Sequence, residues 1–138
     1  MELQNSISKF YDAIIRRDIN CINASYCKDE NTYVILEGPR LSTKGYTLIS
    51  KGWKDFSTSK IALEKIIWTE GPFEEITGNM GWISGIIELH VSINKKTFMN
   101  TFRASFVLKK IENKWKIRHE HVSAPHEDPY GVGDWLQH

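Results

Sequence analysis

Apolar residues in the first part of the chain recur with the spacing of amphipathic helices. Over residues 3–16 they lie three and four positions apart, and charged residues fill the intervening positions. This pattern predicts a helix with one buried face, made of Leu3, Ile7, Phe10, Tyr11, Ile14 and Ile15. Asp18 is placed to cap a short second helix, and a third helix is expected after Ser42 or Thr43 and through Phe56.

The second half of the chain has the pattern of strands. Four long β segments are expected, at residues 61–70, 79–93, 97–110 and 114–123, with short turns between them. A shorter β-rich run at residues 32–38 separates the second and third helices. Helices followed by a long antiparallel meander predict an α+β fold, with the helices packed on one face of a curved sheet.

The length of 138 residues predicts a single domain over residues 1–138. The core is expected at residues 1–125, followed by a structured tail at residues 126–138. Because the tail contains Trp135 and Leu136, we expect it to pack on the body of the protein or on a neighbouring chain.

The run WKIRHEHVSAP, residues 115–125, places two histidines on one face of a strand. Successive side chains of a strand point to opposite faces, so His119 and His121 should share the face of Ile117, and Glu120 should lie on the other. A histidine on an apolar face needs a hydrogen-bond partner, because burial of an unpaired polar group is unfavourable. The two histidines therefore belong either to a polar pocket or to the core.

Two hairpin turns, at residues 112–113 and 94–97, give an expected register for the sheet. Phe106 would lie opposite His119, and Ser105 opposite Glu120, although one extra loop residue would invert this arrangement. The apolar face would then collect Ile87, Leu89, Phe102, Ala104, Phe106, Leu108, Ile117, His119 and His121.

Composition excludes several classes of function. The formal net charge is +1 and basic residues are scattered, which argues against nucleic-acid binding. An apolar stretch long enough to span a membrane does not occur, and the N-terminus lacks the pattern of a signal peptide. We therefore expect a cytoplasmic protein without membrane contact, in which Cys21 and Cys27 are reduced, buried thiols.

Four pieces of the sequence, taken in order, resemble the SnoaL-like branch of the nuclear transport factor 2-like (ketosteroid isomerase-like) superfamily. They are FYDAIIRRDIN, TYVILEGPR, GWKDF and WKIRHEHVSAP, and they span nearly the whole length. The last is the most specific, because a Trp followed by His-x-His-x-Ser recurs in SnoaL-like proteins and in the association domain of calcium/calmodulin-dependent kinase.

The resemblance implies a cone-shaped fold in which three helices close over a strongly bent sheet. A pocket would open at the wide end of the cone, and the outer sheet face would form a homodimer. In the expected register the histidines face the cone, while Glu88, Arg103 and Glu120 lie on the outer face together with Trp82.

Members of this superfamily include ketosteroid isomerases, polyketide cyclases, dehydratases and noncatalytic assembly domains, so the fold alone does not assign an activity. The isomerases and cyclases abstract a proton next to a carbonyl with a carboxylate base. Glu37 is the nearest match to that base, although Gly38 stands between it and Pro39. The facing strand supplies no acidic partner; Phe102 and Phe106 occupy the corresponding positions.

Each candidate residue has a functional and a structural interpretation. His119 and His121 are candidate proton carriers or buried structural residues, and Glu37 is a candidate base or an exposed charge at a strand end. The aromatic residues either line a ligand cavity or fill the core; they are Tyr11, Trp53, Phe56, Phe102 and Phe106. Two histidines alone do not make a metal site, so neither a metal nor a cofactor is expected.

The sequence thus favours a pocket protein for a small apolar or carbonyl-bearing ligand. If it is an enzyme, proton transfer in isomerisation, cyclisation or dehydration is the reaction expected. The alternative is a noncatalytic dimerisation, assembly or sensor domain with a vestigial pocket.

Overall fold

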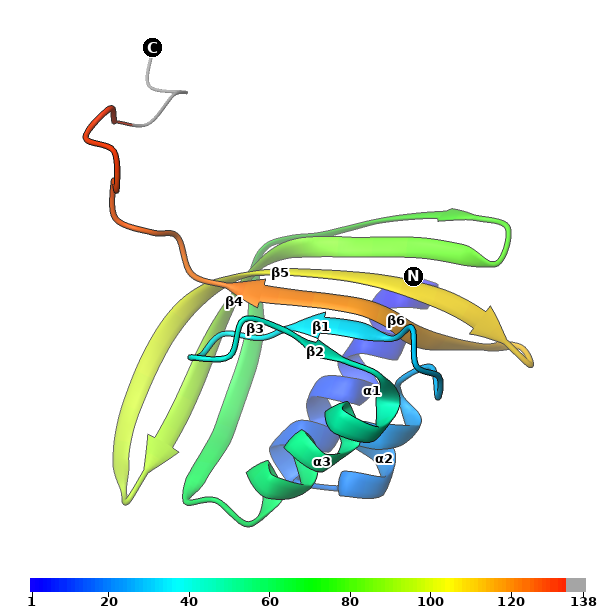
Figure 1. Cartoon of the computed structure of the whole chain (residues 1–138), viewed down its shortest axis with the longest axis horizontal. Helices are drawn as coiled ribbons and strands as arrows, with labels where there is room; N and C mark the ends of the chain where they lie inside the picture. The colour runs from blue at the N-terminus through cyan, green and yellow to red at the C-terminus, as the bar shows by residue number, and fades with distance from the viewer. Residues whose placement is uncertain (134–138) are drawn as a thin grey trace.

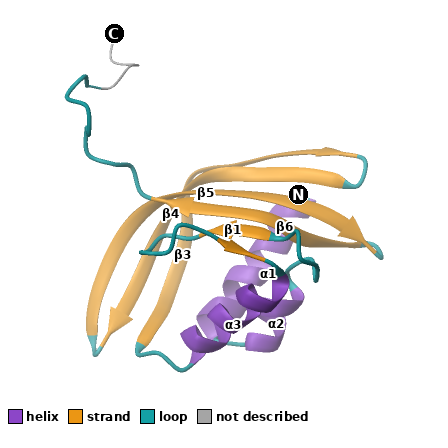
Figure 2. Cartoon of the chain, viewed as in Figure 1, coloured by secondary structure: helices purple, strands orange, loops and turns teal. Residues whose placement is uncertain are grey.

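Three helices cover the concave face of a curved six-stranded sheet in the computed structural model, which describes residues 1–133 (Figure 1). The helices are α1 (Glu2–Arg16), α2 (Ile19–Ala24) and α3 (Tyr46–Ser57). The strands are β1 (Tyr33–Ile35), β2 (Thr43–Lys44), β3 (Ile61–Thr77), β4 (Met80–Ile93), β5 (Lys96–Ile111) and β6 (Lys114–Ser123). Figure 2 shows the separation of helical and strand layers that defines an α+β cone.

The predicted elements are present, with three differences in extent. β3 continues through Gly71-Pro72 to Thr77, where the sequence predicted a turn. The β-rich run at residues 32–38 forms only the three-residue strand β1. The third helix begins after Gly45 rather than after Ser42 or Thr43, because residues 43–44 pair with β1 as strand β2.

The strand order is β2-β1-β6-β5-β4-β3, and the sheet is mixed. β3 to β6 form the predicted antiparallel meander, but β1 runs parallel to β6. Tyr33 of β1 thus pairs with His119 of the last strand, 86 positions later in the sequence, a neighbour that sequence periodicity could not indicate.

The β4–β5 turn is shorter than predicted. Asn94 and Lys95 both have positive φ angles, of 51° and 68°, so Ile93 pairs directly with Lys96. Such two-residue turns match the right-handed twist of the flanking strands. The register shifts by two residues, placing Ile87 opposite Phe102, and an even shift leaves each side chain on its predicted face.

A β-bulge in β6 overturns the predicted orientation of the histidines. Leu108 pairs with Ile117 as expected, but Val107 pairs with His119, so Arg118 is an extra residue. Beyond Arg118, every side chain of β6 lies on the sheet face opposite to the predicted one. Glu120, and not His119, therefore points into the cone.

Arg118 and the residue before it, Ile117, contact segments outside the β5–β6 pair. The Ile117 backbone N–H donates to Ser25, and its carbonyl accepts from Cys27, so this residue bonds to the segment after α2. Arg118 then turns outward, and its Nη1 lies 2.6 and 2.8 Å from the two carboxylate oxygens of Asp29.

The core lies between α1 and the concave sheet face. The Phe10 ring lies edge-on to the rings of Tyr26, Trp53 and Phe106, at centroid distances of 5.5, 6.0 and 6.1 Å. Fully buried aliphatic residues surround these rings: Leu3, Ile7, Ile22, Ile83, Ile87, Leu108 and Ile117. Burial of each such side chain stabilises the fold by about 1.5–3 kcal/mol before the conformational entropy is counted.

The segment after β6 leaves the sheet and extends away from it (Figure 1). Residues 124–133 are exposed, and the Asp128 carboxylate accepts backbone N–H groups of Tyr130, Val132 and Gly133. The prediction for Trp135 and Leu136 falls outside the described residues.

Within residues 1–133, no helix is long and apolar enough to cross a membrane. The cysteines differ from the expectation: Cys27 is buried, whereas Cys21 is exposed on α2.

Candidate functional site

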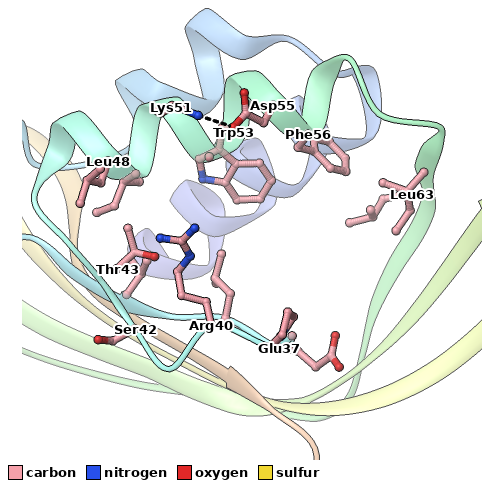
Figure 3. Close-up of a pocket in the computed structure, with 17 residues that line it drawn as sticks. Glu37, Arg40, Ser42, Thr43, Leu48, Lys51, Trp53, Asp55, Phe56 and Leu63 are labelled. Carbon is pink, nitrogen blue, oxygen red and sulfur yellow. Dashed lines mark hydrogen bonds and ion pairs between the residues drawn. The ribbon is translucent and has the colours of Figure 1, made fainter.

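A cavity of about 520 Å³ opens between α3, the loop from β1 to β2 and the start of β3 (Figure 3). Its volume is within the range of sites that hold small organic molecules. The lining is mainly apolar: Val34, Leu36, Pro39, Leu48, Ile49, Trp53, Phe56, Ile61 and Leu63. Polar side chains are confined to Glu37, Arg40, Ser42, Thr43, Lys51 and Asp55.

Gly52 keeps the cavity open on its helical side. At roughly 100° per residue, Gly52 lies at the centre of the arc formed by the α3 residues that border the cavity. These residues are Leu48, Ile49, Lys51, Gly52, Trp53, Asp55 and Phe56. A Cβ atom added at Gly52 would meet no atom within 4 Å. A glycine in a helix interior costs about 1 kcal/mol relative to alanine, and here its lack of a side chain leaves volume for a ligand.

The charges at the cavity are unevenly compensated. Lys51 Nζ lies 2.7 Å from an Asp55 carboxylate oxygen, one helical turn away, so these two charges neutralise each other. Glu37 and Arg40, on the loop after β1, have no ion pair or side-chain hydrogen bond with any residue in the range 1–133. Figure 3 shows the Arg40 guanidinium directed toward Trp53 and the Glu37 carboxylate directed away from it.

Glu120 is a buried acid behind the cavity wall. Its side chain points into the cone because of the bulge at Arg118, and only 3% of the residue is exposed. The Tyr26 hydroxyl donates to Glu120 Oε1 at 2.5 Å and accepts from Trp53 Nε1 at 3.0 Å. Burial raises the pKa of Glu120 to about 7, against the opposing effect of the Tyr26 hydrogen bond.

Two tyrosines share this environment but differ in their partners. Burial raises the pKa of both Tyr11 and Tyr26 well above the ordinary value, and the charge of Glu120 raises each further. Tyr26 has two hydrogen-bond partners. The Tyr11 hydroxyl is buried without a partner among residues 1–133.

Trp53 is the contact between the cavity and the buried acid. Its ring borders the cavity, and its Nε1–H donates a hydrogen bond to the Tyr26 hydroxyl. That hydroxyl in turn donates to Glu120 Oε1. Neither Tyr26 nor Glu120 borders the cavity itself. This chain of hydrogen bonds orients the indole and separates the acid from any molecule in the cavity.

The structure brings together only part of the predicted site. Glu37, the candidate base, and the aromatic candidates Trp53 and Phe56 border the cavity. Tyr11, Phe102 and Phe106 are buried in the core instead and do not border it. Trp53 and Phe56 of α3 thus line the cavity, whereas Tyr11, Phe102 and Phe106 pack in the core.

The prediction that His119 and His121 face the cone is wrong. Because of the bulge, both histidines lie on the outer sheet face, opposite Val107 and Ser105. The ring of His119 stacks on Tyr33 at a centroid distance of 5.9 Å, and its Nδ1 atom lies 2.8 Å from the Tyr33 carbonyl oxygen.

Sequence reasoning missed Glu120 and Tyr26. The period-two pattern placed Glu120 outside, and no sequence pattern marked Tyr26 as a candidate. The extra residue at Arg118 became visible only in the structure, where its side chain forms an ion pair with Asp29. No group of three or more His, Cys, Asp or Glu side chains among residues 1–133 is arranged to hold a metal ion.

The fold and the cavity define a class: an α+β cone with an apolar pocket at its open end. A family model of the SnoaL-like domain matches residues 3–127, so the chain belongs to the SnoaL-like family. No curated protein matches the sequence.

Solved structures share this fold at low sequence identity. A nuclear transport factor 2-like superfamily protein from Salmonella enterica has a TM-score of 0.78 at 22% identity, covering 96% of this chain and 95% of its own. A nuclear transport factor 2-like protein of unknown function from Pseudomonas putida has a TM-score of 0.74 at 18% identity, and the match covers 93% of this chain and 87% of that protein. A ketosteroid isomerase-like protein from Erwinia carotovora has a TM-score of 0.72 at 12% identity, and the match covers 90% of this chain and 95% of that protein. At these identities the likeness establishes the fold and leaves the function open.

Proposed function

We propose that this protein binds a small, largely apolar molecule in the cavity beneath α3. The cavity itself is the observation that carries the proposal. It has a ligand-sized volume, a mainly apolar wall and a helix glycine at the centre of that wall. SnoaL-like family membership and the likeness to a ketosteroid isomerase-like protein agree with a small-molecule ligand.

Binding has more support than catalysis. His119 and His121 lie on the opposite face of the sheet, and Glu120 is shielded from the cavity by Trp53. Proton transfer by Glu120 would require displacement of the Trp53 indole. Of the predicted catalytic residues, only Glu37 borders the cavity, and it is exposed at the cavity edge.

Substitution of Gly52 tests the proposal. The uncharged probes 1-naphthylacetamide and octanamide would be titrated into the native protein by isothermal titration calorimetry. A Gly52→Phe side chain would project into the cavity, so affinity should fall by about tenfold or more. Gly52→Ala is the matched control, because its methyl group leaves most of the volume free.

Circular dichroism would first show that both variants are folded. Equal affinity of the Gly52→Phe and Gly52→Ala variants would place binding elsewhere and overturn the proposal. The same conclusion would follow if neither probe, nor its carboxylate analogue, bound the native protein.

As a separate proposal, the outer sheet face forms a homodimer. Trp82 on β4 is 43% exposed there and lies opposite Val107 on β5. A shallow hollow of about 200 Å³ adjoins this pair, bordered by Glu75, Thr77, Met80, Gly81, Trp82 and Val107. A large exposed aromatic residue beside a hollow is suited to a self-complementary contact.

A further inference from the structure

We propose that the ligand of this cavity is an amphipathic monoanion whose carboxylate is bound by Arg40. The inference rests on the proposed function and adds the chemical class of the ligand. Its basis is the distribution of charge at the cavity, where one exposed cation, Arg40, has no ion-pair partner among residues 1–133 and directs its guanidinium toward Trp53.

Arg40 is the cation in question. It borders the cavity from the loop between β1 and β2, and its guanidinium is directed toward Trp53 on α3 (Figure 3). None of the ion pairs or hydrogen bonds within residues 1–133 involves its side chain. An unpaired guanidinium beside apolar walls is suited to bind a carboxylate through two parallel hydrogen bonds.

The other charged residues of the cavity do not compensate the charge of Arg40. Lys51 is neutralised by Asp55 at 2.7 Å. Glu37 stands three residues before Arg40, but its carboxylate is directed away from α3 and does not lie within ion-pair distance of the guanidinium. The four charged residues of the lining sum to a formal charge of zero, and Arg40 is the cation among them without an ion pair to any residue in the range 1–133, so it offers an anion a site for its charge.

The rest of the lining indicates the shape of the ligand. Ser42 and Thr43 border the cavity, and the Thr43 hydroxyl lies on the side of Arg40 (Figure 3). Trp53, Phe56 and Leu63 continue the wall as an apolar surface. This arrangement fits a carboxylate head with a chain of about eight carbons or a two-ring aromatic body, the size of compound that such a cavity encloses.

Matched pairs of probes test the inference. Affinities of 1-naphthylacetate and octanoate would be compared with those of their neutral, nearly isosteric amides, by calorimetry at pH 7.5 and low salt. The native protein should bind each carboxylate about tenfold or more tightly than the corresponding amide, because a charge-assisted pair replaces a neutral hydrogen bond.

Variants then assign the preference to one residue. Arg40→Gln should remove the preference for the carboxylates while changing amide affinity by less than about twofold. Arg40→Lys should retain part of it, because a lysine keeps the charge without the planar fork. Lys51→Gln is the control, and it should leave the preference unchanged because Lys51 already has a partner.

The two proposals fail in different ways. If the amides bind as tightly as the carboxylates, or if Arg40→Gln retains the preference, the inference is overturned while the cavity remains a binding site. A tighter complex with 1-naphthylmethylamine than with 1-naphthylacetate would likewise overturn it, and would assign recognition to Glu37. If no probe binds, both proposals are overturned.

Discussion

At the scale of single residues, Glu120 has the most unusual environment in the described part of the chain. Its carboxyl group is buried in the cone with the Tyr26 hydroxyl as its hydrogen-bond donor. One hydrogen bond does not replace the water that surrounds an exposed carboxylate, so burial favours the protonated form and raises the pKa to about 7. The protein therefore carries a group that titrates near neutral pH within its core.

This pKa shift makes the stability depend on pH. The pKa of Glu120 is about 7 in the folded state and 4.5 as the ordinary value, so between these pH values the folded protein retains a proton that the unfolded chain releases. The free energy of unfolding should therefore decrease as pH rises from 4.5 to 7, by a total of about 3 kcal/mol, and this contribution should then level off.

Urea unfolding of native protein and of a Glu120→Gln variant at several pH values would measure this effect. The difference in stability between them should change across the window, because glutamine does not titrate. Glu37→Gln, which removes an exposed carboxylate, should leave the dependence as it is in the native protein. A native profile parallel to that of Glu120→Gln would contradict the raised pKa.

The two buried tyrosines should respond differently to loss of their hydroxyl groups. Tyr26→Phe would leave both Glu120 and Trp53 Nε1 without a partner, so it should destabilise the protein by about 1–3 kcal/mol. Tyr11→Phe removes a buried hydroxyl that has no partner in the described chain, and should change stability by less than about 1 kcal/mol. Chemical denaturation at pH 6 would compare them; equal losses would mean that the Tyr11 hydroxyl has a partner such as a bound water.

At the scale of elements, β6 shows how one inserted residue changes the location of a site. The apolar alternation up to Ile117 is regular, and the turn at residues 112–113 sets the predicted pairing with Leu108. At the bulge, the Arg118 side chain lies outside the sheet and binds the carboxylate of Asp29, a residue far away in the sequence. Periodicity is a local property, so it predicted the strand correctly and placed His119 and Glu120 on the wrong faces.

The third helix shows the opposite case, in which a local feature has a meaning that only packing reveals. Gly52 interrupts a helix pattern that contains Ile49, Trp53 and Phe56, and by propensity alone it is a weak point. In the folded protein it faces open volume, between residues that border the cavity. Helical periodicity correctly placed Trp53 and Phe56 on the side of the sheet; that they border a cavity depends on the loop carrying Arg40.

At the scale of the whole molecule, the two faces of the sheet have different roles. The concave face holds the core and the cavity, and the convex face carries Trp82 and the two histidines. If the convex face forms a homodimer, light scattering after size exclusion should give twice the chain mass of 16.0 kDa for native protein. Trp82→Lys should reduce it to the mass of one chain, because a lysine introduces a charge that a buried contact would have to desolvate.

Phe98→Lys is the matched control for this prediction. Phe98 is an aromatic residue of β5 that is 49% exposed, but its side chain belongs to the face that also carries Phe102. This variant should keep the dimer mass. A native protein with the mass of one chain would contradict the homodimer, and a Trp82→Lys variant with the mass of two would place the contact elsewhere.

The sequence by itself determined the helices, the long strands, the class of fold and the family resemblance, because these follow from local periodicity and from short motifs that keep their order. It also named Trp53 and Phe56 as candidate cavity residues and Glu37 as a candidate base, and all three border the cavity in the structure. Only the tertiary structure decided that Glu120 is buried and that the histidines face outward, since both follow from the bulge in the pairing of β6 with β5. The cavity itself is also tertiary, because its volume lies between elements whose separation no local pattern sets.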